Sequence, residues 1–131
     1  MKKLQVACII DDDAIAIFGM KRSLMSVSCD IDLLVYENGY DAFVAIKEKF
    51  EAGEEIPSPL FVDLNMPVMD GWDFIKEMRN LLPKEAERPE MYIMTSSIDV
   101  KDMERAKKID LGSNYLIKPV APEVFEGLLC K

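Results

Sequence analysis

Aspartates follow two apolar runs of this sequence. VACIIDDD, residues 6–13, ends in Asp11, Asp12 and Asp13, and LFVD, residues 60–63, ends in Asp63. Carboxylates a few ångströms apart raise one another's pKa, so a proton or a cation must relieve the repulsion. Mg²⁺ is a hard ion that takes oxygen ligands and keeps several waters. If the two runs lie side by side, these aspartates predict a magnesium site that leaves a position free for a phosphate oxygen.

Two further polar residues also follow apolar runs. Thr95 comes after residues 91–94, and Lys118 comes after residues 115–117. An ammonium group can hold a phosphate oxygen and a hydroxyl can donate to one, so both favour charge developing on a phosphoryl group. An aspartate such as Asp63, held beside Mg²⁺ and these two groups, is placed to attack phosphorus and form an acyl phosphate.

The elements that must position these residues alternate along the chain. Short apolar runs predict buried strands, and the runs between them carry apolar residues at helical spacing. The expected strands are Leu4–Ile10, Ile31–Tyr36, Leu60–Asp63, Met91–Met94 and Tyr115–Ile117. The expected inward-facing helix residues are Ile17, Met20, Leu24 and Val27; Phe43, Ile46 and Phe50; Phe74, Ile75, Met78 and Leu82; Val100, Met103 and Ala106; and Val124, Phe125, Leu128 and Leu129. Five such units predict an α/β domain with a doubly wound parallel sheet, whose ligands bind beyond the carboxyl ends of the strands.

Local signals predict where several helices begin. Asp99 is expected to cap one helix, Asp70-Gly71 to form the turn before another, and Pro122 to occupy a first helical turn. Asp13 is interpreted as an acid favoured in a first turn by the helix dipole.

Length and charge limit the classes of function. The chain has 131 residues, which predicts one domain over 1–131. Its formal charge is -8, so we expect no direct binding of nucleic acid. The absence of histidine excludes Ser-His-Asp and Cys-His nucleophiles and zinc sites that use imidazole. The N-terminal MKKLQVACII is too short an apolar run for a signal peptide, so a strand and no membrane insertion are expected.

Three cysteines, Cys8, Cys29 and Cys130, are odd in number and show no paired spacing. They are interpreted as reduced thiols of a cytoplasmic protein.

The motifs together resemble a known family. The acidic pair Asp11-Asp12, the stretch DLNMPVMDG from Asp63, Thr95 after IM, and YLIKP at residues 115–119 resemble the receiver domain of two-component response regulators. The resemblance covers essentially the whole chain, in order and at the family's spacing. It implies a flavodoxin-like (βα)5 fold with strand order 2-1-3-4-5.

The resemblance also implies roles for single residues. Asp63 matches the phosphoacceptor, Asp12 a direct magnesium ligand and Asp11 its water-mediated companion. The backbone carbonyl of Asn65 would complete the protein's share of the metal site. Lys118 matches the phosphate-binding lysine, and its bond to Pro119 is expected to be cis.

Thr95 and Tyr115 match the family's switch pair, in which the hydroxyl moves toward the phosphoryl group and the ring turns inward. The third acid, Asp13, leaves open a reading of the metal pair as Asp12-Asp13, although the apolar run that ends at Ile10 favours Asp11-Asp12.

The expected function is that of a phosphoacceptor in a phosphorelay. The partners implied are a histidine kinase or histidine phosphotransfer protein and a downstream effector protein, with a phosphorylation-dependent dimer left open. No effector domain follows Lys131, so a stand-alone cytoplasmic regulator is expected, and an excised receiver is the alternative. Enzyme activity is expected only toward its own phosphorylation and dephosphorylation.

Two alternative functions remain at this point. A magnesium-dependent phosphohydrolase would use an aspartyl nucleophile and a second aspartate two residues later. Asp11 and Asp13 have that spacing, but Ala14 and Ile15 lack the rest of the motif and Asp63 would be unexplained. A degenerate receiver that binds a partner without phosphate normally lacks an acid or the lysine, and here all are present.

Overall fold

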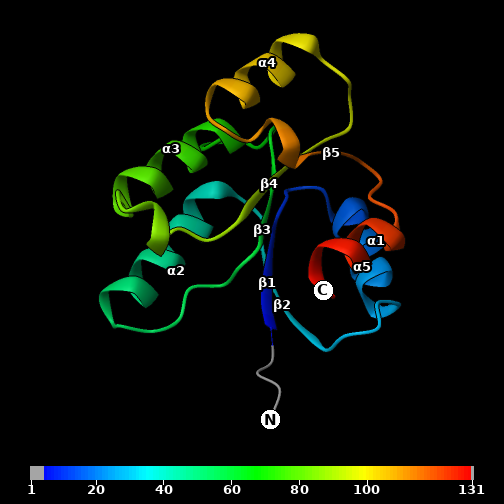
Figure 1. Ribbon diagram of the computed structural model, residues 1–131, viewed down its shortest axis with the longest axis horizontal. Helices are drawn as coiled ribbons and strands as arrows, with labels where there is room; N and C mark the ends of the chain where they lie inside the picture. Colours follow the sequence, from blue (N-terminus) through cyan, green and yellow to red (C-terminus); the bar gives the residue numbers. More distant parts are fainter. Residues whose placement is uncertain (1–4, 131) are drawn as a thin grey trace.

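The computed structural model describes residues 5–130 and contains one sheet of five parallel strands in the order β2-β1-β3-β4-β5 (Figure 1). The strands are β1 (Gln5–Ile10), β2 (Ile31–Tyr36), β3 (Leu60–Asp63), β4 (Met91–Thr95) and β5 (Tyr115–Ile117). The helices are α1 (Ala14–Met25), α2 (Gly39–Glu51), α3 (Gly71–Leu81), α4 (Val100–Lys108) and α5 (Pro122–Leu129), with short 3₁₀ turns η1 (Glu85–Glu87) and η2 (Gly112–Asn114). The predicted fold class and strand order are confirmed. Leu4, the expected start of the first strand, lies outside the described residues.

Helices cover both faces of the sheet because the central strands are apolar on both sides. In β1, Ala7 and Ile9 pack in a cluster with residues of α1 and α5, whereas Cys8 and Ile10 pack in a second cluster with residues of α2 and α3. All four side chains are fully buried. Figure 1 shows α1 and α5 on one side of the sheet, α2 and α3 on the other, and α4 near the end of the sheet that carries β5.

Helix starts follow the capping rules. Asp99 accepts a hydrogen bond from the Lys101 amide at 2.8 Å, which confirms the predicted cap. Asp70, predicted as part of a turn, also caps its helix by accepting from the Asp73 amide at 2.8 Å. Pro122 is the first residue of α5, where its missing N–H leaves no helical hydrogen bond unmade.

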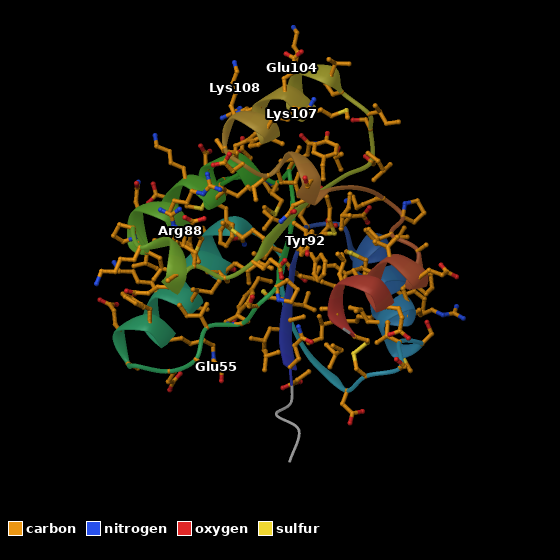
Figure 2. All side chains as sticks on the ribbon, in the orientation of Figure 1. Glu55, Arg88, Tyr92, Glu104, Lys107 and Lys108 are labelled. Carbon is orange, nitrogen blue, oxygen red and sulfur yellow. A yellow bond between two sulfur atoms is a disulfide. The ribbon has the colours of Figure 1, made fainter. Side chains whose placement is uncertain are left out.

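The inward faces of two helices differ from the prediction. Val100 and Met103 of α4 are 65% and 38% exposed, and Ala106 is the buried residue of that helix. The helix lies near the edge strand, so a narrow stripe of it meets the core; Figure 2 shows Glu104 and Lys108 pointing away from the sheet. Phe50 at the end of α2 is also exposed, at 38%.

Smaller differences concern α1 and α5. α1 ends at Met25, so Val27 of the expected inward stripe lies beyond the helix. Val124 of α5 is 39% exposed, whereas Phe125 and Leu129 of the same helix are buried.

The interpretation of all three cysteines as reduced thiols is wrong for two of them. Cys29 and Cys130 form a disulfide with their Cα atoms 5.4 Å apart, seen in Figure 2 as the yellow bond beside the end of α5. Their separation of 101 residues hides this pairing in the sequence. The parallel fold brings the loop before β2 and the end of α5 to one place. Cys8 stays a buried thiol, and burial raises its pKa to about 12.

The helices of the domain are short. The longest, α2, has 13 residues. Within residues 5–130, no helix combines the length and the apolar character that a bilayer crossing requires.

Candidate phosphoryl-transfer site

The residues singled out at strand ends gather at one edge of the sheet. Asp11 follows β1, Asp63 ends β3, Thr95 ends β4 and Lys118 follows β5. Because all five strands are parallel, these ends lie on the same side. Backbone hydrogen bonds continue past the strands and fix the positions: the Lys118 amide donates to the Thr95 carbonyl at 2.7 Å.

Three carboxylates meet at this edge. Oxygen atoms of Asp11, Asp12 and Asp63 lie within 4.8 Å of one another. Asp11 and Asp63 are 0% and 4% exposed, whereas Asp12 is exposed to solvent. The site is therefore buried on the protein side and open on the side of Asp12.

Lys118 connects the two buried acids. Its Nζ donates to Asp11 Oδ2 at 2.9 Å and lies 3.2 Å from Asp63 Oδ1. The peptide bond between Lys118 and Pro119 is cis, as the resemblance implied. One ammonium group thus faces three carboxylates, and the site keeps an excess of negative charge.

This charge distribution shifts the pKa of the central groups. Burial, and then the charge of Asp11, raise the pKa of Asp63 to about 6, although Lys118 acts in the opposite direction. Burial alone would lower the pKa of Lys118, but the hydrogen bond to Asp11 and the charges of Asp63 and Asp11 outweigh it, so the pKa is raised.

The backbone around Asp63 is held closely by the first turn of α3. A Cβ added to Gly71 would lie 2.6 Å from the Asp63 carbonyl oxygen, so only glycine fits there. The Gly71 amide donates to the Leu64 carbonyl at 3.0 Å. Asp70-Gly71 is therefore structural, as predicted. The contact of this glycine with the Asp63 carbonyl was not predicted from the sequence.

Asp13 is the N-cap residue of α1, so it lies just before the first turn in which the sequence interpretation placed it. Its carboxylate accepts a hydrogen bond from the Ile15 amide at 2.9 Å and caps α1, while its own amide donates to Asp11 Oδ1 at 3.0 Å. The acidic group at this edge contains Asp11 and Asp12 with Asp63, and Asp13 serves the helix.

Thr95 and Tyr115 lie on neighbouring strands. The Thr95 hydroxyl is buried, donates to the Ser97 carbonyl at 3.2 Å and accepts from the Ser97 amide at 3.3 Å. Tyr115 packs against the core on the side of α2 and α3, and burial raises its pKa. Its hydroxyl is buried, and the nearby Thr95 side chain acts in the opposite direction on the pKa. Asn65, two residues after Asp63, is exposed in the loop that follows β3.

A groove beside this edge was not predicted from the sequence. It has a volume of about 450 Å³ and runs between α1 and the segment after β5, with Ile15, Gly19, Ser96 and Lys118 among its lining residues. Ile15 is 83% exposed. The sign in the sequence that could have indicated the groove is Ile15 itself, an apolar residue near Asp12 that does not belong to the inward-facing stripe of α1.

Comparisons with known proteins agree with this arrangement. A family model described as the response regulator receiver domain matches residues 7–129. The chain is 27% identical over 120 residues to the hybrid signal transduction histidine kinase L of Dictyostelium discoideum, which covers 91% of this chain and 7% of that protein. The chain spans less than half the length of the curated relatives it matches, from 7% to 44%.

Solved structures share the fold. A two component response regulator from Cytophaga hutchinsonii superposes with a TM-score of 0.81 at 24% identity, covering 97% of this chain and 95% of that one. The Mn²⁺-bound form of response regulator Rcp1 superposes with a TM-score of 0.74 at 18% identity, covering 95% and 91%. With the family model matching nearly the whole sequence, the chain belongs to the response regulator receiver domains of two-component systems.

Proposed function

We propose that this receiver takes a phosphoryl group onto Asp63 from a histidine kinase or histidine phosphotransfer protein, and that the change alters which protein it binds. The observation that carries the proposal is the contact of Lys118 with both Asp63 and Asp11 at a rim that is open beside Asp12. An acid, a cation and a solvent-open face therefore combine at the carboxyl ends of the strands.

The transfer requires one bond to form and one to break. An Asp63 carboxylate oxygen attacks phosphorus, and the P–N bond of the donor phosphohistidine breaks, leaving its electron pair on the imidazole nitrogen. The chain contains no histidine, so the donor imidazole belongs to the partner. Lys118 is within reach of the phosphoryl oxygens and would favour their charge.

The acidic group fits a divalent cation of the magnesium class. Its donors are all oxygens, and one ammonium group does not balance three carboxylates. Asp11, Asp12 and Asp63, with the Asn65 carbonyl, would hold Mg²⁺. A bound Mg²⁺ would supply positive charge for the carboxylates and for the incoming phosphoryl oxygens.

The response is assigned to Thr95 and Tyr115. In this structure the Thr95 hydroxyl is occupied by Ser97, so turning toward a phosphoryl oxygen at Asp63 requires it to give up those bonds. Tyr115 lies beside Thr95, and the interaction of the two side chains opposes the rise that burial causes in the pKa of Tyr115. Phosphorylation therefore has two neighbouring groups to bias.

The partner's approach is assigned to the open rim. The groove lined by Ile15 and Lys118 offers an apolar wall beside the acceptor, as a docking protein that carries a phosphohistidine would need. We place this exchange, and the downstream effector protein, in the cytoplasm, without direct nucleic-acid binding, and we leave a phosphorylation-dependent dimer as a further output. We also propose that residues 1–131 form a single receiver domain.

The test is incubation with Mg²⁺ and acetyl phosphate, followed by mass spectrometry. We expect one hydroxylamine-labile phosphoryl group on Asp63 and none on Asp63→Asn. Asp32→Asn, an exposed acid in β2, is the matched control and should label like the wild type. Equal labelling of Asp63→Asn would refute the assignment, and steady hydrolysis of an added phosphate ester would favour the phosphohydrolase instead.

A further inference from the structure

A second group of potential ligands lies away from the phosphoryl-transfer site, at the amino end of β2. Cys29 precedes this strand, and Glu126 and Cys130 belong to the end of α5. Potential ligand atoms of the three residues lie within 4.8 Å of one another. Ligands of open α/β sheets bind beyond the carboxyl ends of the strands, whereas this group lies at an amino end. The proposed phosphoryl transfer therefore does not use it.

Two of the ligands are arranged by the helix itself. Glu126 and Cys130 are four residues apart, and the Cys130 amide donates to the Glu126 carbonyl at 2.9 Å, so helical spacing continues to Cys130. Residues at this spacing share one face of a helix, which is how pairs of metal ligands are often presented.

The loop before β2 orients the other side of the group. The Ser28 amide and hydroxyl donate to the Glu126 carboxylate at 3.1 and 2.9 Å, and the Cys29 amide lies 3.3 Å from Cys130 Sγ as a donor. A carboxylate can accept about four hydrogen bonds or ligand contacts, so Glu126 keeps capacity for an ion. Hydrogen bonds of this kind orient ligands around a metal.

We propose that Cys29, Glu126 and Cys130 form a redox-gated site for a thiophilic divalent ion such as Zn²⁺. In the oxidised form seen here the two sulfurs are bonded to each other and offer no thiolate. Two low-molecular-weight thiols reduce the bond: they become one disulfide, and Cys29 and Cys130 each gain a hydrogen. When the ion binds, both thiols release their protons to solvent, and the two thiolates and the Glu126 carboxylate supply three ligands.

The ligand set and its surroundings fit zinc better than magnesium. Zn²⁺ takes thiolate, imidazole and carboxylate ligands at about 2.0–2.3 Å, while Mg²⁺ prefers oxygen alone. Cα atoms 5.4 Å apart leave the two side chains close enough to reach one ion. All three residues are partly exposed, so the ion can enter and a water can fill a fourth position.

The redox state of the Cys29–Cys130 pair depends on the compartment. Disulfides in cytoplasmic proteins, where a receiver meets its kinase, are usually transient. The same cysteine pair would then hold the end of α5 against the loop before β2 in two ways, through a disulfide when oxidised and through an ion when reduced.

The experiment uses Co²⁺ as a spectroscopic probe on the full chain. Protein is reduced with a phosphine, freed of reductant without oxygen, and titrated with Co²⁺ in excess Mg²⁺, which occupies the acidic site. We expect a near-ultraviolet sulfur-to-cobalt absorption that saturates at one equivalent and is abolished by Zn²⁺. The oxidised protein should show none.

Variants separate this site from other ligands. Cys29→Ser and Cys130→Ser should lose the absorption, and Glu126→Gln should weaken Zn²⁺ binding by about tenfold or more. Cys8→Ala, which removes the buried thiol of β1, is the matched control and should keep the full absorption. The reduced wild type also lacks the disulfide, so the comparison does not depend on it for folding; if a serine variant fails to fold, Glu126→Gln decides the question.

Three results would overturn the proposal: no sulfur-to-cobalt absorption in the reduced wild type, undiminished absorption in Cys29→Ser, or unchanged Zn²⁺ affinity in Glu126→Gln. The gate has its own check. Protein purified in air and unfolded in denaturant should have one titratable thiol, that of Cys8. Three titratable thiols would show that the disulfide does not form.

Discussion

The surroundings of Asp63 favour its protonated form when no cation is bound. Burial and the neighbouring Asp11 raise its pKa to about 6, against about 3.9 for an unfolded aspartate. The folded state therefore holds this proton more tightly than the unfolded state does. The resulting stability is present below the unfolded pKa and is lost as pH rises from about 4 through 6.

Replacing Asp63 with asparagine should therefore stabilise the metal-free protein at neutral pH. A shift of about two pKa units corresponds to about 3 kcal/mol, and solvent at the open rim reduces the expected gain to about 1–2 kcal/mol at pH 7.5. The gain should shrink toward pH 4, where Asp63 is protonated in the folded state and about half protonated in the unfolded state. Urea unfolding in the presence of a chelator measures it.

Asp32→Asn serves as the control for this prediction, because its exposed carboxylate has no comparable surroundings. It should change the free energy of unfolding by less than about 0.5 kcal/mol at either pH. A gain for Asp63→Asn that stays constant from pH 4 to 7.5 would show that ionisation of Asp63 is not its cause.

At the scale of elements, the loop between β3 and α3 carries backbone strain. Val68 has φ of 69°, in the left-handed region that β-branched residues rarely adopt, and its side chain is 90% exposed. The side chain therefore gains little from packing while its backbone is unfavourable.

Val68→Asn should stabilise the domain by about 0.5–1 kcal/mol, because asparagine tolerates this conformation better than valine. Thermal unfolding measures this gain. The control is Val100→Asn, which makes the same substitution at an exposed valine with helical backbone, the first residue of α4. The control should gain nothing. A lower melting temperature for Val68→Asn would mean that the valine makes a contribution which its exposure does not reveal.

Elements were predictable where a segment's own pattern decides them. The bounds of β2, β3 and β5 agree with the sequence prediction because each is a short apolar run between polar turns. The inward face of α4 was not predictable in this way. Val100 and Met103 have helical spacing, but how much of a helix is covered depends on its neighbours in space.

The candidate site was also predictable only in part. Parallel strands bring their carboxyl ends together, so Asp11, Asp63 and Lys118 could be placed at one edge from the sequence. That Lys118 contacts both acids, and that Asp11 is buried while Asp12 is exposed, depends on side-chain directions after each strand. The disulfide was missed because its cysteines are 101 residues apart in the sequence.

At the scale of the whole molecule, the Cys29–Cys130 bond closes a loop that contains most of the chain. Such a crosslink stabilises mainly by restricting the unfolded ensemble, and longer loops gain more. Reduction, with a chelator present to keep metal away, should lower the free energy of unfolding by about 2–4 kcal/mol.

Urea unfolding of oxidised and reduced protein measures this difference. Oxidised Cys8→Ala is a control for cysteine loss as such: it keeps the crosslink, so reduction should cost it as much as it costs the wild type. An equal unfolding midpoint for oxidised and reduced wild type would contradict the prediction.

The close fit of Gly71 against the Asp63 carbonyl has a consequence for how motion spreads. The Gly71 amide also donates to the Leu64 carbonyl at 3.0 Å, so backbone packing and a hydrogen bond both tie the start of α3 to the end of β3, and we expect this flank to move little. If Asp63 is phosphorylated as proposed, we expect displacement to pass through the opposite flank, where the Lys118 amide donates to the Thr95 carbonyl and the chain leads into α4 and α5. Such a response would have a direction, away from α3 and toward α4 and α5.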